Sequence, residues 1–262
     1  MNILDEIIQY KYDEVEENRS LYPVKLLERS IYFKTKPVSL KRYLLRMDKC
    51  GIIAEFKRRS PSKGTINEYA SVEEVSIGYM QAGASALSVL TDKKFFGGSN
   101  NDLTVARKFN YCPVLRKDFI IDEYQVIEAK SVGADVILPI AEVLTGVQIN
   151  KLAGLAKSFG LEVIMEMHDE EGLGKLNENI DIVGVNNRNL KNFSVDFKTS
   201  LSLAEKIPEN FIKISESGIG DPETINELKA AGYNGFLIGE TFMRTSRPEK
   251  TCARFINSIR QL

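Results

Sequence analysis

Short apolar runs alternate with segments of helical periodicity along most of the chain from Gly51 onward. The runs are rich in Val, Ile and Leu. They lack the regular alternation with polar residues that is typical of a strand with one solvent-exposed face. This pattern predicts parallel strands that are buried on both faces. The eight runs are Ile52–Phe56, Ala86–Leu90, Pro113–Leu115, Val136–Ile140, Val163–Met165, Ile182–Val185, Phe211–Ile214 and Gly235–Ile238.

Several segments between these runs have helix patterning and end in glycine. A glycine just past a helix adopts the left-handed conformation at low energetic cost, so it marks the end of a helix. Asp221, Pro222 and Glu223 have the order of an N-cap, a first-turn proline and a first-turn acid. The predicted helices are Val72–Gly83, Glu123–Gly133, Thr145–Gly160 and Asp221–Gly232.

Eight strands that alternate with helices predict an α/β fold of the (β/α)₈ TIM-barrel type with an N-terminal helical extension. We expect residues 1–262 to form a single TIM-barrel domain, with the extension over 1–48 and the barrel over 49–262. Leu4, Ile7, Ile8 and Val15 indicate an amphipathic helix within the extension. A doubly wound sheet is the alternative, but no GxGxxG motif follows the first run.

The composition narrows the classes of partner. Lys and Arg total 35 and Asp and Glu total 36, so the global charge does not favour nucleic acid or an anionic membrane. The three cysteines are far apart in sequence and form no CxxC motif, which disfavours a disulfide framework and a zinc site. An acidic, interrupted N-terminus and the absence of an apolar run of ~20 residues predict a cytoplasmic protein without a membrane span. No obligate protein partner is inferred.

Charged and polar residues follow the predicted strands at their C-terminal ends, where TIM barrels place their active sites. Glu55 and Lys57 follow the first run and, with a period of two, point to the same side. Charges that converge over an apolar core destabilise the fold unless they pair with each other or with a substrate. A structural salt-bridge network is the alternative interpretation. The remaining residues of this set are Lys117, Glu166, Asn186, Arg188, Glu216 and Ser217.

Glycines at the ends of the last two predicted strands indicate a phosphate site. Ser217-Gly218 follows the seventh run and Gly239-Glu240 follows the eighth. The corresponding loops of TIM barrels commonly bind phosphate, because glycine lets backbone N–H groups approach the anion. One Ser-Gly pair would be weak support, and two on these two strands favour a phosphorylated ligand.

Five stretches of the chain resemble the signatures of the indole-3-glycerol phosphate synthase family, and the resemblance covers nearly the whole chain. Asn189, where Asp is more usual, and Met165 and Met167 beside Glu166 depart from the family pattern. The stretches are Ile53–Gly64 (IAEFKRRSPSKG), Val89–Ser99 (VLTDKKFFGGS), Leu115–Phe119 (LRKDF), Gly184–Leu190 (GVNNRNL) and Ser215–Ile219 (SESGI).

The resemblance implies a carbon–carbon lyase of tryptophan biosynthesis that uses no cofactor and no metal. The substrate would be 1-(2-carboxyphenylamino)-1-deoxyribulose 5-phosphate, and the products would be indole-3-glycerol phosphate, carbon dioxide and water. Attack of the ring carbon on the sugar carbonyl needs a cationic acid to protonate the developing alkoxide. The family position of that acid matches Lys117. Lys57 and Glu166 match the candidates for acid and base in the dehydration, although the assignment of steps stays open.

The other site residues carried over from the family have binding or orienting roles. Glu55 and Asn186 match groups that orient the reacting side chains and bind the sugar hydroxyls. Phosphate binding carries over to Ser217, Gly218, Gly239 and the backbone N–H of Glu240, whose carboxylate should point away from the anion. The remaining candidates for substrate binding are Ser60, Phe96, Phe119, Arg188 and Glu216; for the two phenylalanines, core packing is an equal alternative.

The sequence also allows other functions. A related phosphate-binding barrel, such as a phosphoribosyl isomerase or a Schiff-base aldolase with Lys117 as nucleophile, is one alternative, and a non-catalytic binding protein is another. We expect His168 to have a surface or capping role beside Asp169, which should cap the next helix. The three cysteines should be buried or inert. Arg58, Arg59 and Lys63 either form a solvated loop or attract an anionic substrate.

Overall fold

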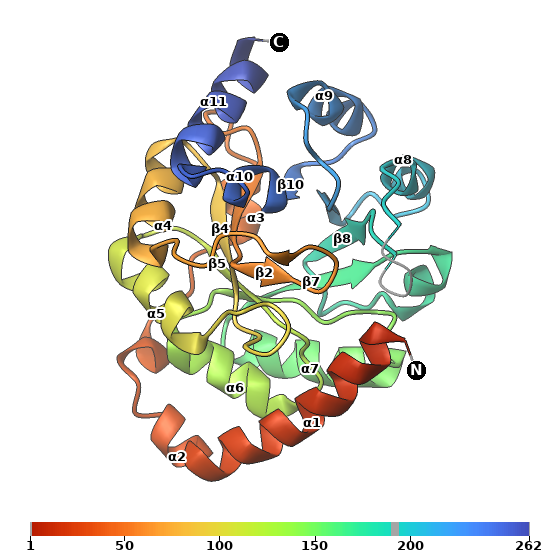
Figure 1. Ribbon diagram of the computed structural model, residues 1–262. Coiled ribbons are helices and arrows are strands. Elements are labelled where there is room, and N and C mark those ends of the chain that lie inside the picture. The colour runs from red at the N-terminus through yellow and green to blue at the C-terminus, as the bar shows by residue number, and fades with distance from the viewer. Residues whose placement is uncertain (1, 190–193, 262) are drawn as a thin grey trace.

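The computed structural model of the protein describes residues 2–189 and 194–261 and contains a closed barrel of parallel strands (Figure 1). Its sheet closes where the first strand pairs with the last, with Ile52 opposite Phe236. The predicted TIM barrel is therefore confirmed. The barrel strands are β1 (Ile52–Phe56), β4 (Ala86–Leu90), β5 (Val114–Lys117), β6 (Val136–Ile137), β7 (Glu162–Met167), β8 (Ile182–Asn186), β9 (Ile212–Glu216) and β10 (Gly235–Ile238).

Each predicted run overlaps a strand, and the largest difference is in β6. The apolar run continues to Ile140, but the strand ends at Ile137. Pro139 has no N–H to donate to a neighbouring strand, so the ladder breaks there. Ile140 then returns to the sheet for one isolated bridge to Glu166.

The predicted helices are also present, with small shifts at their ends. Asp221 caps its helix by accepting a hydrogen bond from the Glu223 amide at 2.9 Å, and Gly133 ends another helix with φ 94°. The helices after the first strand are α4 (Val72–Gln81), α5 (Asn100–Phe109), α6 (Glu123–Val132), α7 (Gly146–Ser158), α8 (Lys198–Ala204), α9 (Pro222–Ala230), α10 (Glu240–Met243), α11 (Pro248–Gln261) and the 3₁₀ turn η2 (Glu170–Lys175).

The chain before the barrel is helical, as expected, and it contacts the barrel along most of its length. Its elements are α1 (Ile3–Leu21), α2 (Val24–Leu27), η1 (Ile31–Lys34) and α3 (Leu40–Leu44). Figure 1 shows α1, in red, lying along the outside of the barrel beside α6. Leu40 and Leu44 of α3 are buried at the end of the barrel where the strands begin. There Leu44 packs against Gly235, the first residue of β10.

Side chains along β1 alternate between two apolar layers. Ile52 and Ala54 point outward into the layer between sheet and helices, whereas Ile53 packs inside the barrel with Ile164 and Ile214. The same alternation directs Glu55 inward, at the end of the barrel that carries the C-terminal ends of the strands. The apolar interior therefore forms the floor beneath a set of charged side chains.

A short hairpin that the sequence did not predict extends from the end of β1. It pairs β2 (Arg59–Ser60) with β3 (Gly64–Thr65), and it lies in front of the barrel in Figure 1. The Arg59 amide donates to the Phe96 carbonyl at 3.2 Å, and Lys63 Nζ lies 3.9 Å from the carboxylate of Glu240. The hairpin therefore contacts the loops that follow β4 and β10, the two strands that flank β1.

Two further sequence-based expectations concern the whole chain. The cysteines Cys50, Cys112 and Cys252 are all free and buried, in agreement with the expectation. Within residues 2–189 and 194–261, no helix combines the length and the apolar character that crossing a bilayer requires.

Candidate active site

A pocket opens at the C-terminal ends of the barrel strands, beneath the hairpin. Every candidate site residue expected from the sequence lines this pocket. They are Glu55, Lys57, Ser60, Phe96, Lys117, Phe119, Glu166, Asn186, Arg188, Glu216, Ser217, Gly218, Gly239 and Glu240. The fold thus brings together side chains from six strands and from the loops that follow them.

Glu55 and Lys57 form an ion pair on one wall of the pocket. Lys57 Nζ lies 2.7 Å from Glu55 Oε1, and both side chains are largely buried. The carboxylate occupies space beside Gly239, where a Cβ atom would lie 2.3 Å from Glu55 Oε1. Glycine at position 239 is therefore needed for the observed position of Glu55, in addition to any role of its backbone.

Lys117, Glu166 and Asn186 form a second group in the pocket. Lys117 Nζ donates to Glu166 Oε2 at 2.8 Å, and the Asn186 amide donates to Glu166 Oε1 at 2.8 Å. Burial alone would lower the pKa of Lys117, but the carboxylates of Glu166, Glu216 and Glu55 outweigh it and raise the pKa above its ordinary value. The ammonium form of Lys117 is therefore the stable one at neutral pH.

Glu216 lies at the end of β9 and is nearly inaccessible to solvent. Burial, followed by the nearby carboxylate of Glu166, raises the pKa of Glu216 well above its ordinary value. Its Oε1 has no hydrogen-bond partner among the described residues. A Cβ atom at Gly184 would lie 2.6 Å from this oxygen, so a glycine in β8 provides its space. Burial and the neighbouring carboxylate thus favour the protonated form of the Glu216 side chain, and one of its buried oxygens has no partner among the described residues.

Two aromatic rings border the pocket on the side of β4 and β5. The ring centroids of Phe96 and Phe119 are 6.0 Å apart with an interplanar angle of 42°. Phe119 is buried and Phe96 is half-buried, and Leu90 and Ile140 add aliphatic surface beside them. This part of the pocket fits a flat, apolar group.

The loops after β9 and β10 form the opposite end of the pocket. Ser217 and Gly218 both have positive φ angles, 69° and 74°, so the chain turns sharply there. Gly239 precedes α10, a helix of one turn, and also lines the pocket. The carboxylate of Glu240 lies 3.5 Å from the guanidinium of Arg188, and this ion pair holds the Glu240 side chain towards Arg188.

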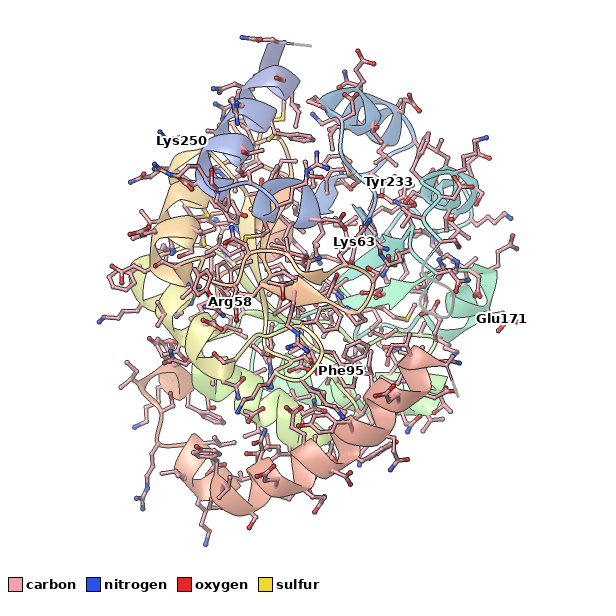
Figure 2. All side chains as sticks on the ribbon, in the orientation of Figure 1. Arg58, Lys63, Phe95, Glu171, Tyr233 and Lys250 are labelled. Atoms are coloured by element: carbon pink, nitrogen blue, oxygen red, sulfur yellow. The ribbon has the colours of Figure 1, made fainter. Side chains whose placement is uncertain are left out.

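Several residues discussed from the sequence do not reach the pocket. Arg58 is bound by Asp102 through two hydrogen bonds of 2.7 and 2.9 Å, and Arg59 binds the Lys94 carbonyl, so these arginines support the hairpin and α5. Figure 2 shows Arg58 and Lys63 over the front of the barrel. Among the described ion pairs of these three basic residues, that of Lys63 with Glu240 reaches a residue that lines the pocket.

His168 is half-buried and directly follows β7, and the pocket lining among the described residues does not include it. Its Nδ1 lies 2.8 Å from the Asn186 carbonyl, and Asp169 caps η2 by accepting from the Glu171 amide at 3.0 Å. The expected cap at Asp169 is confirmed. His168 itself makes no capping bond in the described hydrogen-bond network, and it contacts the backbone of a pocket residue from outside.

Asp118 is a pocket residue that the sequence reasoning missed. Burial opposes its ionisation, but the ammonium of Lys11 and the guanidinium of Arg116 lower its pKa to about 2. Its position directly after Lys117 at a strand end was the available signal. In residues 2–189 and 194–261, no cluster of His, Cys, Asp and Glu has the arrangement of a metal site.

Comparison with known proteins identifies the family. The family model described as indole-3-glycerol phosphate synthase matches residues 4–255. The chain belongs to the indole-3-glycerol phosphate synthase family. An indole-3-glycerol phosphate synthase of Bacteroides thetaiotaomicron is 48% identical over 258 residues, which cover 98% of this chain and 99% of that protein. The synthase of Thermoanaerobacter pseudethanolicus is 42% identical over 92% of each chain.

Solved structures of other enzymes share the fold with low sequence identity. The crystal structure of 3-hexulose-6-phosphate synthase from Salmonella typhimurium superimposes with a TM-score of 0.61 at 13% identity, covering 80% of this chain and 99% of that one. N-acetylmannosamine-6-phosphate 2-epimerase from Clostridium perfringens gives a TM-score of 0.57 at 15% identity, covering 80% and 94%. These two comparisons support the barrel fold alone.

Proposed function

We propose that this family member converts 1-(2-carboxyphenylamino)-1-deoxyribulose 5-phosphate into indole-3-glycerol phosphate, carbon dioxide and water with Lys117 as the general acid of ring closure. The observation that carries the proposal is the position of Lys117. Its ammonium lines the pocket and donates to Glu166 at 2.8 Å, and nearby carboxylates raise its pKa. A protonated amine that faces a ligand pocket is suited to protonate a developing alkoxide.

Ring closure joins the carboxylate-bearing ring carbon to the sugar carbonyl carbon. As that bond forms, the carbonyl oxygen takes a proton from Lys117 and becomes a hydroxyl group. The ring carboxylate then leaves as carbon dioxide, and its electron pair restores the aromatic ring. Glu166, held between Lys117 and Asn186, stabilises the positive charge before transfer and keeps the ammonium aimed into the pocket.

Dehydration needs one group to donate a proton to the new hydroxyl and one to remove a proton from the intermediate. We assign the donor to Lys57 and the acceptor to Glu166. Lys57 belongs to the ion pair with Glu55 on another wall, so acid and base approach the intermediate from different sides. Burial raises the pKa of Glu216, which favours its uncharged form and limits the negative charge in the pocket.

The two ends of the pocket suit the two ends of the substrate. Phe96 and Phe119 provide the apolar wall for the aryl ring, and Ser60 and Arg188 also line the pocket. The turns at Ser217-Gly218 and Gly239-Glu240 provide the site for the phosphate, in the loops that TIM barrels commonly use. We further infer that the enzyme works in the cytoplasm and without an obligate protein partner.

A Schiff-base aldolase that uses Lys117 as nucleophile is the second candidate from the sequence. An amine nucleophile must lose its proton first, which usually requires a lowered pKa. The raised pKa of Lys117 favours the general acid instead. The intact group of Lys57, Lys117 and Glu166 in one pocket also disfavours a binding protein without catalytic activity.

Incubation of the purified chain with the substrate tests the proposal directly. Turnover should produce the fluorescence of an indole, in buffer containing a chelator and without an added cofactor. Borohydride added during turnover should leave the mass of the protein unchanged. A substrate adduct on Lys117 would replace the general acid with the aldolase mechanism, and no fluorescence would contradict the activity itself.

A further inference from the structure

A buried lysine on the N-terminal helix contacts three carboxylates at the edge of the pocket. Lys11 of α1 has only 1% of its side chain exposed. Its ammonium forms ion pairs with Glu14 of the same helix, with Asp92 at 2.8 Å and with Asp118 at 2.9 Å. Burial opposes the charge of Lys11, but the carboxylates outweigh burial and raise its pKa. Lys11 therefore remains an ammonium ion inside the fold.

Asp92 connects this ammonium to the first aromatic residue of the pocket. Its Oδ2 faces Lys11, while its Oδ1 accepts from the amides of Phe95 and Phe96 at 2.8 and 3.2 Å. Tyr10, the neighbour of Lys11 on α1, packs edge-on against Phe95 with centroids 5.9 Å apart. Figure 2 shows Phe95 beside α1. The backbone that carries Phe96 is thus fixed to α1 through Asp92.

Asp118 connects the same ammonium to the second aromatic residue. Its Oδ1 accepts from Lys11 and also from the amide of Phe119 at 2.8 Å. Its Oδ2 accepts from Thr91 and lies 3.3 Å from the guanidinium of Arg116. Asp118 itself lines the pocket between Lys117 and Phe119.

One cation therefore reaches the backbone of both rings that border the pocket. We propose that Lys11 is a positioning residue that sets the spacing of Phe96 and Phe119 and so determines affinity for the aryl end of the substrate. The proposal rests on the proposed function, because it takes the ring pair as the site of the aryl group. Lys11 touches no substrate in this assignment, and it acts through Asp92 and Asp118.

The competing role for Lys11 is a general anchor of the extension. An anchor would affect folding and all parts of the pocket alike. A positioning residue affects ligands that contact the rings and spares ligands that contact only the loops after β9 and β10. The two roles can therefore be separated with two competitive inhibitors, the product indole-3-glycerol phosphate and inorganic phosphate.

The test compares Lys11→Met with Lys11→Arg and with Arg19→Met. Methionine keeps the length of the side chain without its charge, and arginine keeps the charge. Arg19→Met is the matched control, because Arg19 lies on the same helix and pairs with Asp122 at 2.7 Å, away from the rings. Each variant is assayed at a temperature where circular dichroism shows it to be folded.

Lys11→Met should raise the KM for the substrate and the inhibition constant of the product by about tenfold. The kcat and the inhibition constant of inorganic phosphate should change by less than about twofold, because the loops that bind phosphate are held by other elements. Lys11→Arg should restore most of the affinity for the product, and Arg19→Met should resemble the wild type. Equal weakening of product and phosphate, or no change in either, would overturn the proposal.

A double variant keeps the test decisive if Lys11→Met does not fold. Asp92→Asn removes one of the unpaired carboxylates and retains the oxygen that accepts from Phe95 and Phe96. The double variant, Lys11→Met with Asp92→Asn, is assessed by the ratio of the inhibition constant of the product to that of inorganic phosphate. A wild type without turnover would refute the proposed function, whereas a constant ratio across variants of an active enzyme would refute the role of Lys11.

Discussion

Two lysines at the same end of the barrel, Lys11 and Lys117, both form ion pairs with carboxylates. They differ in how far each side chain is exposed to the pocket. The Lys11 ammonium is surrounded by three carboxylates and its side chain is 1% exposed. The Lys117 ammonium has one short ion pair, to Glu166, and its side chain is 17% exposed where it lines the pocket. Both pKa values are raised above the ordinary value for lysine.

The comparison shows that a raised pKa does not by itself identify a catalytic lysine. Lys11 has no side open to a ligand, so its charge serves to fix the surrounding backbone. Lys117 retains an open side towards the pocket, so its proton can be transferred. What separates the two roles is access to the pocket, because the Lys117 side chain is 17% exposed and lines it, whereas the Lys11 side chain is 1% exposed.

The largest expected effect is on the stability of the fold around Lys11. Lys11→Met leaves Asp92 and Asp118 without their shared cation, and removal of one partner of a buried ion pair costs about 3–5 kcal/mol. Denaturant unfolding should show this loss as a lower midpoint. Arg19→Met should cost less than about 1 kcal/mol, because its ion pair is partly exposed. Similar losses of unfolding free energy in both variants would mean that the buried ion pairs of Lys11 stabilise the fold no more than the partly exposed pair of Arg19.

The second effect concerns the proposed role of Lys117 as general acid. Lys117→Met should lower kcat by at least ~10², about 2.7 kcal/mol, with a smaller change in KM, because the acid acts in the transition state. Steady-state kinetics with the ring-closure substrate measure it. Lys63→Met is the control: this lysine is exposed at the mouth of the pocket and should change kcat by less than about threefold. A retained kcat in Lys117→Met would move the general acid to Lys57.

These two lysines also show which site residues the sequence predicts and which it does not. Lys117 follows an apolar run, so strand periodicity and barrel geometry placed it at the mouth in advance. Lys11 was not predicted, because the N-terminal helix was described by its apolar residues Leu4, Ile7, Ile8 and Val15. A lysine in register with that stripe was the available signal. Its partners Asp92 and Asp118 are distant in sequence, and only the closed barrel brings them together.

The same limit explains the other gaps in the sequence-based picture. The barrel strands follow from local apolar patterns, and four helices follow from their caps and terminal glycines. The hairpin at Arg59–Thr65 has no apolar pattern of its own, since it is held by contacts to Phe96 and Glu240. The space that Gly184 and Gly239 leave for Glu216 and Glu55 depends on neighbouring strands, so no single stretch of sequence reveals it.

The third effect extends the comparison to the opposite end of the pocket, where backbone rather than charge is proposed to bind the ligand. Gly218→Val should raise KM by about tenfold, because the residue has φ 74° and its Cβ would lie 2.4 Å from Val195. Ser217→Ala should change KM by less than about threefold, because alanine keeps the backbone N–H. Steady-state KM values and inhibition by inorganic phosphate measure the difference. Equal effects of the two substitutions would argue for binding by the serine hydroxyl.

The smallest effect is a difference in pH dependence between the carboxyl groups beside the two lysines. The pKa of Glu216 is raised, so the proton that it binds stabilises the fold at low pH, and this contribution is lost as the pH rises through the folded pKa. The pKa of Asp118 is lowered to about 2, so its contribution is present above its unfolded pKa and is lost as the pH falls towards 2.

Glu216→Gln and Asp118→Asn should therefore change stability at opposite ends of the pH range. Without substrate, the Tm of wild type should fall relative to Glu216→Gln as the pH rises through the raised folded pKa of Glu216, because glutamine has no proton to lose. The Tm of wild type should fall towards that of Asp118→Asn below about pH 4, because the unfolded carboxyl takes up protons there. Thermal unfolding by circular dichroism across this range measures both. Parallel curves for wild type and Glu216→Gln would show that folding does not raise the pKa of Glu216, and Lys117 would then be surrounded by three ionised carboxylates, as Lys11 is.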